Sequence, residues 1–189
     1  MNNKIISIII TAYNEEDNVV ELHRQLNEVI LEIPKYNFEL IFIENGSTDK
    51  TLENLKVLSE KDSKVKIIKL SRNFGFDGGM TAGLDNVTAD AAIVMTANLQ
   101  DNPYVIPEFI EKWEEGFDMV YGIVKSRPGK SIIRKFNSKI YYKILKRATN
   151  NLIPKDVSDY RLIDKKVINA LTQLRESNRF FRGFFSWVG

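Results

Sequence analysis

The chain has 189 residues and no cysteine, so it can form one sizeable domain but neither a disulfide framework nor a thiolate metal site. Hydrophobic residues make up 43% of it, which argues against global disorder. The net charge of +2 is unevenly spread: residues 1–122 carry 11 Lys and Arg against 21 Asp and Glu, whereas residues 123–189 carry 16 against 4. The basic part is either a solvated face or, as we favour, a surface that meets anionic phosphate or lipid head groups.

Apolar runs and helical patterns alternate along the first two thirds of the chain. The first run, residues 4–11, is a continuous apolar stretch rich in β-branched residues, which is the pattern of a strand buried on both faces. We predict strands at residues 4–11, 38–44, 65–70, 91–95 and 119–124, and helices at residues 19–33, 52–58, 75–87 and 106–115. This order predicts an α/β fold with a Rossmann-like, mostly parallel sheet and helices on both faces.

Polar residues follow four of the predicted strands. They are Tyr13–Glu15, Glu44–Asp49, Arg72–Asn73 and Thr96–Asp101. In an open parallel sheet the carboxyl ends of the strands share one edge, and ligands bind in the crevice beyond it. We therefore expect these four segments to form one binding site. His23 lies within the first predicted helix, away from this edge, and is expected to be structural or to face solvent.

The last third of the chain is basic. Residues 131–148 place apolar residues on one helical stripe and Lys and Arg on much of the rest, so the helix either packs on the core or lies on an anionic membrane. Residues 179–189 gather four Phe and one Trp among two Arg, a composition that suits a membrane interface. No segment has the roughly 20 apolar residues that a membrane-spanning helix needs. The abrupt aromatic ending suggests a natural chain that continues into transmembrane helices.

Five motifs in order resemble the family-2 glycosyltransferases of GT-A fold, and within them the dolichol-phosphate mannosyltransferase and bactoprenol glucosyltransferase branch. These motifs are TAYNEE (11–16), ENGSTDKT (44–51), SRNFG (71–75), NLQDNP (98–103) and SDYRL (158–162), and residues 178–189 resemble the branch as well. The resemblance covers essentially the whole chain. It implies one catalytic domain over residues 1–189, with a nucleotide-sugar-binding core in 1–124 and an acceptor- and membrane-facing part in 125–189.

The resemblance also implies an activity, its substrates and its location. The enzyme would be an inverting glycosyltransferase that moves a sugar from a UDP- or GDP-linked donor to a polyprenyl or dolichyl phosphate. It would work at the cytoplasmic face of an anionic membrane, anchored there in the full-length protein. The resemblance is compatible with either base in the donor and with a homo-oligomer.

By resemblance, the donor is bound by residues of all four polar segments: Tyr13, Asn14, Glu15, Glu44, Asn45, Ser47, Asp49, Arg72, Asn73, Asn98 and Leu99. The chemistry agrees, because Tyr13 can face a base while Glu15 and Glu44 can accept hydrogen bonds from ribose hydroxyls or base N–H groups. Each has a structural alternative. Glu15 can equally cap a helix, Asp49 can be an N-cap, and the two residues of the third segment can cap the helix that follows.

The family's metal site is an Asp-x-Asp pair followed by Leu-Gln, and this sequence departs from it. Thr96 and Asn98 replace the two Asp, which leaves Asn98, Gln100 and Asp101 as the candidate ligands. Mg²⁺ is usually held by one or two carboxylates together with phosphate oxygens. The site therefore either binds Mg²⁺ or Mn²⁺ weakly with help from the diphosphate, uses basic residues instead, or is inactive. We favour weakened but real use of a divalent metal.

A basic loop follows the fifth predicted strand and contains Lys125, Arg127, Lys130 and Arg134. In the resembled branch this loop closes over the donor and its Arg residues meet phosphates. The guanidinium group suits that role because it binds phosphate oxygens in a bidentate fork. The alternative is a loop that is merely solvated.

Asp159 resembles the acceptor-side Asp of the family and, with Arg161, is the candidate catalytic group. A lipid phosphate is already anionic at neutral pH, so its oxygen needs no strong base. Asp159 would then orient groups and stabilise developing oxocarbenium charge. The structural alternative is an ion pair with Arg161 or a turn cap.

Other functions fit less well. Gly129-Lys130-Ser131 lacks the upstream Gly of a P-loop, since position 124 is Val, and no G-x-G-x-x-G follows the first strand as a dinucleotide site would need. The basic part carries no nucleic-acid-binding motif, so we expect no nucleic-acid partner. Thr96 and Asn98 keep one alternative open, which is a catalytically weak or silent homologue that scaffolds membrane glycan assembly.

Overall fold

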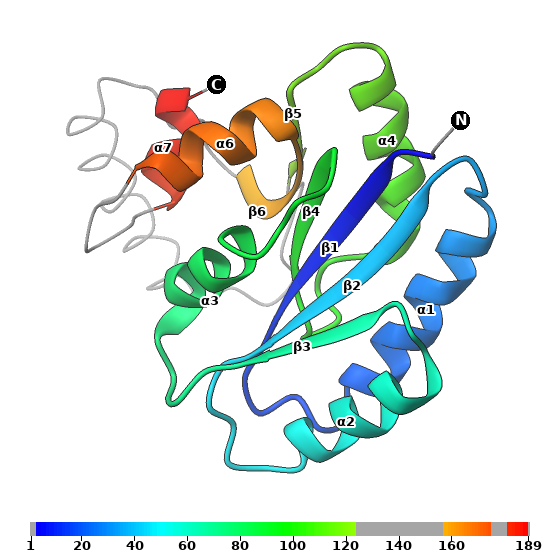
Figure 1. Cartoon of the computed structure of the whole chain (residues 1–189), viewed down its shortest axis with the longest axis vertical. Helices are drawn as coiled ribbons and strands as arrows, with labels where there is room; N and C mark the ends of the chain where they lie inside the picture. The colour runs from blue at the N-terminus through cyan, green and yellow to red at the C-terminus, as the bar shows by residue number, and fades with distance from the viewer. Residues whose placement is uncertain (1–2, 124–156, 175–180, 189) are drawn as a thin grey trace, which may run out of the picture.

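The structure is a computed structural model that describes residues 3–123, 157–174 and 181–188. Within these residues the centre is a six-stranded sheet in the order β3-β2-β1-β4-β6-β5 (Figure 1). Its strands are β1 (Ile5–Ala12), β2 (Asn37–Glu44), β3 (Val65–Lys69), β4 (Ala91–Thr96), β5 (Met119–Ile123) and β6 (Val157–Asp164). The mostly parallel α/β sheet predicted from the sequence is confirmed.

β6 is the strand that the sequence prediction missed. It lies between β4 and β5 and runs antiparallel to both. Tyr160 and Leu162 pack on one face of the sheet, and Ile163 packs on the other. The buried Arg161 and the polar Ser158-Asp159 pair interrupt the hydrophobic pattern, so this segment lacks the continuous apolar run that marks β1 and β4.

Helices cover both faces of the sheet, as predicted (Figure 1). On one face lie α1 (Val19–Leu31), α2 (Thr51–Lys61) and α4 (Ile106–Glu114), the last preceded by the short 3₁₀ helix η1 (Pro103–Val105). On the other lie α3 (Gly75–Leu84), α6 (Lys165–Gln173) and α7 (Phe181–Val188). Each of the four helices predicted from periodicity is present within a few residues of its expected bounds.

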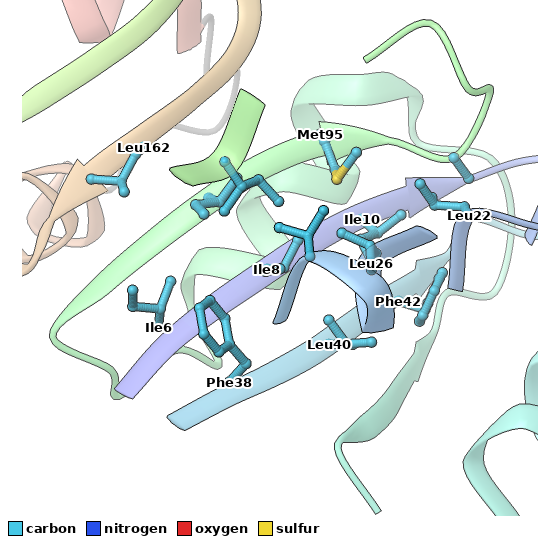
Figure 2. Packing of buried hydrophobic residues seen from close by; sticks show 14 of the residues in the cluster. Ile6, Ile8, Ile10, Leu22, Leu26, Phe38, Leu40, Phe42, Met95 and Leu162 are labelled. Carbon is cyan, nitrogen blue, oxygen red and sulfur yellow. The ribbon is translucent and has the colours of Figure 1, made fainter. Parts of the chain in front are cut away.

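β1 is buried from both sides, which explains why most of its residues are apolar. Ile6, Ile8 and Ile10 share one hydrophobic cluster with Leu26 of α1 (Figure 2). Ile9 belongs to the cluster on the opposite face, which includes residues of α3. All five side chains have no exposed surface. Truncating a buried Leu or Ile to Ala costs about 2–5 kcal/mol, so replacing any of these side chains by Ala should destabilise the fold strongly.

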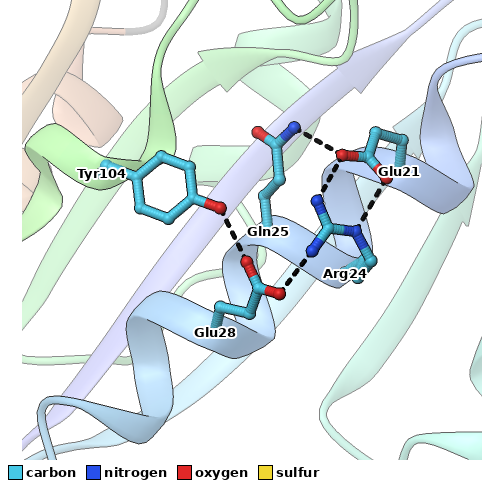
Figure 3. Close-up of polar contacts among 5 residues, drawn as sticks. All are labelled: Glu21, Arg24, Gln25, Glu28 and Tyr104. Atoms are coloured by element: carbon cyan, nitrogen blue, oxygen red, sulfur yellow. Dashed lines mark hydrogen bonds and ion pairs between the residues drawn. The ribbon is translucent and has the colours of Figure 1, made fainter.

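Exposed polar side chains tie η1 to α1 (Figure 3). The phenol of Tyr104 donates to Glu28 Oε2 at 2.6 Å, and Arg24 lies between Glu28 and Glu21. Gln25 Nε2 donates to Glu21 Oε1 at 2.8 Å. Exposed ion pairs add little to stability. These contacts nevertheless hold η1, which follows the loop after β4, against α1.

His23 joins α1 to the end of α2. Its Nε2 lies 2.8 Å from Asp62 Oδ2, and Asn27 Nδ2 donates to the same oxygen at 3.2 Å. The structural role expected for His23 is confirmed.

The C-terminal part differs in one respect from its prediction. Phe181 and Phe185 of α7 are 1% and 2% exposed and pack with α3 and α6, so the expectation that this aromatic segment faces a membrane is wrong for these two side chains. Their spacing of four residues places both on one face of the helix, and apolar side chains of α3 and α6 cover that face. The helix predicted at residues 131–148 lies outside the described residues. In the part of the chain that the structure describes, no helix is long and apolar enough to cross a bilayer.

Candidate functional site

The four polar segments predicted to form one site do reach the same edge of the sheet. β1 pairs in parallel with both β2 and β4, and β2 pairs in parallel with β3, so their carboxyl ends point the same way. The loops that follow these strands carry the predicted donor-binding residues. Because β6 runs the opposite way, its first residues also lie at this edge.

The loops after β1 and β2 are bound to each other. Asn14 has a left-handed backbone with φ of 54°, its N–H donates to Ser47 Oγ at 3.1 Å, and its Oδ1 accepts from the N–H of Thr48 at 2.9 Å. The backbone N–H of Glu15 donates to Thr51 Oγ1 at 2.8 Å. Asn14 and Ser47 therefore lie together, as a shared ligand site requires.

Asp49 connects both loops to the start of α2. Its Oδ1 accepts from the N–H of Thr51 at 3.0 Å and its Oδ2 from the N–H of Glu16 at 3.1 Å. Burial raises the pKa of Asp49, but these hydrogen bonds outweigh it and hold the pKa below its ordinary value. Through these contacts Asp49 holds the loops in place, although the N-cap residue of α2 is Lys50 and not Asp49 as the structural alternative had it.

Glu44 and Asn45 end β2 and are almost fully buried, at 1% and 4% exposure. Glu44 accepts a hydrogen bond from the N–H of Ser47. Tyr13 is 42% exposed beside them, open to a stacking partner. The carboxylate of Glu15 accepts from Asn18 Nδ2 at 2.6 Å, at the start of α1.

The loop after β3 is held against the loop after β2. Asn45 Nδ2 donates to the carbonyl of Gly75 at 2.9 Å, and Asn45 Oδ1 accepts from the N–H of Phe74 at 2.9 Å. Arg72 is exposed, with its guanidinium 4.7 Å from the centre of the Phe74 ring. Asn73 Oδ1 accepts from the N–H of Gly75 at 2.7 Å, at the start of α3, whose N-cap residue is Phe74. The exposed Arg72 can still turn toward a bound anion.

The loop after β4 holds the candidate metal ligands. Thr96 Oγ1 lies 2.8 Å from Asn98 Oδ1 and 2.9 Å from Asp101 Oδ2, and that same carboxylate oxygen accepts from the N–H of Thr96 at 3.0 Å. Leu99 has φ of 57°, which turns the chain sharply. Gln100 is exposed.

Among the residues that the structure describes, no three His, Cys, Asp or Glu side chains are grouped to hold a metal ion. The loop after β4 offers neutral oxygens and the one carboxylate of Asp101. Such a donor set fits an ion only where phosphate oxygens complete its shell.

β6 brings Asp159 to this edge. Arg161 pairs with Val94 and Leu162 with Ile93, so the residues before Arg161 lie toward the carboxyl end of β4. The phenol of Tyr160 donates to the carbonyl of Asn102 at 3.0 Å, which fastens β6 to the loop after β4. Burial raises the pKa of Tyr160, so it stays a neutral donor. Sequence reasoning missed Tyr160 because it missed β6.

Arg161 is 3% exposed and belongs to the face of the sheet that α7 covers. Its Nη2 donates to the carbonyl of Ser158 at 2.9 Å, and its Nε donates to that of Asp159 at 3.3 Å. These contacts favour a positioning role over direct contact with substrate. Lys125, Arg127, Lys130 and Arg134, the predicted phosphate-binding loop, lie outside the described residues.

Comparison with known proteins agrees with this geometry. A model of the family described as glycosyl transferase family 2 matches residues 7–172. The chain is 43% identical over 184 residues to an uncharacterized glycosyltransferase of Synechocystis sp., which covers 97% of this chain and 58% of the relative. It is 34% identical over 184 residues to a bactoprenol glucosyl transferase of Shigella phage SfX, covering 97% and 60%. The chain thus spans less than two thirds of the length of these relatives.

Solved structures share the fold. Glucosyl-3-phosphoglycerate synthase from Mycobacterium tuberculosis, in complex with Mn²⁺, UDP-glucose and phosphoglyceric acid, matches with a TM-score of 0.63 at 15% identity, over 87% of this chain and 58% of its own. A mannosyltransferase from Pyrobaculum calidifontis, in complex with GDP-Man and Mn²⁺, matches with a TM-score of 0.60 at 14% identity, over 90% and 47%. At identities this low, the likeness shows a shared fold alone.

Proposed function

The chain belongs to glycosyl transferase family 2, and we propose that it moves a hexose from a UDP- or GDP-linked donor to a polyprenyl phosphate. The observation that carries the proposal is the meeting of the β1, β2, β3 and β4 loops with the first residues of β6 at one edge of the sheet. A relative named bactoprenol glucosyl transferase supports the lipid acceptor. Structures of this fold in complex with UDP-glucose or GDP-Man support the donor class.

The donor would bind on the β1–β2 side of the site. The exposed ring of Tyr13 offers a stacking face for the base, and the buried end of β2 offers the carboxylate of Glu44. Arg72 would meet the diphosphate from the neighbouring loop. Because Asn14, Ser47 and Asn45 are held by hydrogen bonds between loops, the pocket would be largely formed before the donor arrives.

The acceptor would approach from the β6 side. Its phosphate oxygen forms a bond to the anomeric carbon while the bond from that carbon to the diphosphate oxygen breaks, and the electron pair leaves with the nucleoside diphosphate. The configuration at the anomeric carbon inverts. Since the attacking oxygen is already ionised, Asp159 would orient the reactants and stabilise positive charge on the sugar.

A divalent ion would be held weakly. Asn98, Gln100 and Asp101 would share Mg²⁺ or Mn²⁺ with the donor diphosphate, and the ion would neutralise charge on the leaving group. Structural neighbours that contain Mn²⁺ support this cofactor. The uncharged side chains of Thr96 and Asn98 are the reason to propose weak rather than tight binding.

The membrane would be the place of action. Residues 123–189 carry 16 Lys and Arg against 4 Asp and Glu, which suits attraction to anionic head groups, and the proposed acceptor is a membrane lipid. We propose that the catalytic domain works at the cytoplasmic face, anchored by other parts of the full-length protein.

The test is transfer of label from a panel of UDP- and GDP-hexoses to a short polyprenyl phosphate, with Mn²⁺ and with EDTA. We expect one donor to give a lipid-linked product. The Asp159→Asn variant should form much less of it. Absence of product from every donor, with donor binding intact, would overturn the proposed reaction.

A scaffold without activity is the second candidate, favoured by Thr96 and Asn98. Calorimetric titration with UDP- and GDP-sugars separates the two functions. An enzyme binds one donor, and more tightly with Mn²⁺, whereas a scaffold binds none.

A further inference from the structure

α7 is packed onto the core by two features of different kinds. Its buried residues Phe181 and Phe185 have ring centres 5.8 Å apart and share a hydrophobic cluster with α3 and α6. At its start, the backbone N–H of Phe181 donates to Asp77 Oδ1 of α3 at 3.3 Å. α3 itself begins at Gly75, directly after the loop that holds Arg72. α7 is therefore attached to the helix that follows the donor-side loops.

α7 also contacts Arg161 of β6. The guanidinium carbon of Arg161 lies 3.9 Å from the centre of the Phe185 ring, close enough for a cation–π contact between two buried groups. Such a contact is stronger when water is excluded, as it is here. Phe181 occupies a similar buried place one turn earlier, but the ring under the guanidinium is that of Phe185.

Arg161 in turn binds the backbone at Ser158 and Asp159. Its Nη2 and Nε donate to the carbonyls of Ser158 and Asp159, at 2.9 and 3.3 Å. These carbonyls lie at the start of β6, at the edge where the site loops meet. Because the Phe185 ring holds the guanidinium group in place, these hydrogen bonds also hold the backbone that carries the Asp159 side chain.

We propose that Phe185 and Arg161 are positioning residues, through which α7 holds the start of β6 and aligns Asp159 for transfer. The inference rests on the proposed function, because it gives Asp159 a role in that reaction. α7 thereby links the helix behind the donor loops to the strand that carries the acceptor-side carboxylate. Misplacing a reacting group by about 1 Å can cost about 100-fold in rate, so a contact this remote from the sugar can matter.

The test compares Phe185→Leu and Arg161→Lys with Phe181→Leu. Phe181→Leu is the matched control, because it removes an equally buried ring from the same helix and leaves the ring under Arg161. Two readouts are taken in the same protein preparations: amide hydrogen exchange in the peptide that covers residues 157–160, and kcat and donor KM for transfer to polyprenyl phosphate.

We expect faster exchange at residues 157–160 in Phe185→Leu and Arg161→Lys, with kcat lowered about 10-fold and donor KM unchanged. Phe181→Leu should show wild-type exchange in that peptide and wild-type kcat. Equal effects in both Leu variants would overturn the inference, and so would unchanged exchange in Arg161→Lys. If the wild-type protein transfers no sugar, the proposed function fails, while hydrogen exchange still decides whether Phe185 and Arg161 hold β6.

Discussion

Asp101 binds back onto Thr96, with one carboxylate oxygen 3.0 Å from the Thr96 backbone nitrogen and 2.9 Å from its hydroxyl oxygen. Asp101, the one carboxylate among the candidate metal ligands, thus also closes the loop after β4. A metal ion would compete for this oxygen with two donors of the protein. Carboxylates at positions 96 and 98 would give the ion charged oxygens besides that of Asp101.

The double variant Thr96→Asp with Asn98→Asp should bind Mn²⁺ more tightly in the presence of a nucleoside diphosphate. Two added carboxylates supply the charged oxygens that a hard cation prefers. We expect affinity to rise about 10-fold or more, measured by calorimetric titration of Mn²⁺ into protein with UDP or GDP.

The matched control makes the same chemical changes at the other end of β4, where Asn86→Asp and Thr88→Asp add two exposed carboxylates. This control should leave Mn²⁺ affinity unchanged. If it tightens binding as much as the double variant does, the gain reflects net charge and the loop after β4 is not the metal site.

Asp159→Asn should lower kcat about 100-fold and leave donor affinity unchanged, because the carboxylate would act on the transition state. Asp118→Asn serves as the control, since Asp118 is an exposed carboxylate that pairs with Lys166 at 3.0 Å. Steady-state transfer kinetics and donor titration measure the two effects. A rise in donor KM at constant kcat would place Asp159 in donor binding instead.

The helices and strands could be predicted where burial produces a recognisable pattern of apolar residues in the sequence. β1 and β4 are continuous apolar runs because both of their faces are covered, and α1 shows helical spacing because one face is buried. β6 could not be predicted in this way. Its buried Arg161 is accommodated by an aromatic ring and two carbonyls that come together only in the folded chain.

The site could be predicted in position but not in its internal contacts. Polar residues at the ends of parallel strands must meet, so the shared edge followed from topology. Whether Asp49 contacts substrate or holds Thr51 depends on side-chain geometry, which spacing does not encode. The burial of Phe181 and Phe185 likewise depends on the surface that α3 and α6 present, and composition alone suggested a membrane instead.

Acid should weaken the fold through Asp62. Burial raises the pKa of Asp62, but hydrogen bonds from Lys64, His23 and Asn27 outweigh it and lower the pKa below its ordinary value. A carboxyl group whose pKa is lowered by folding stabilises the protein fully above its unfolded pKa of about 4, and this contribution is lost as the pH falls toward the folded value.

Asp62→Asn should therefore cost about 1–3 kcal/mol of unfolding free energy at pH 7, and progressively less below about pH 4. Urea unfolding at several pH values measures the difference between the two proteins. A difference that stays constant down to pH 2 would show that the carboxylate charge does not contribute. Asp17→Asn, at an exposed position, supplies the comparison for a general change in net charge.

Gly46 and Gly116 allow the cost of backbone strain to be distinguished from the cost of steric contact. Both have positive φ, at 73° and 102°, but a Cβ on Gly46 would lie 2.5 Å from the Arg72 carbonyl carbon, whereas a Cβ on Gly116 would meet nothing within 4 Å. Each Ala variant should lose about 1–2 kcal/mol through strain. Gly46→Ala should lose more in urea unfolding and should also weaken donor binding, because it separates the loops that carry Ser47 and Arg72. Equal losses of stability would mean that the two loops move apart freely, and the pocket would then form only when the donor binds.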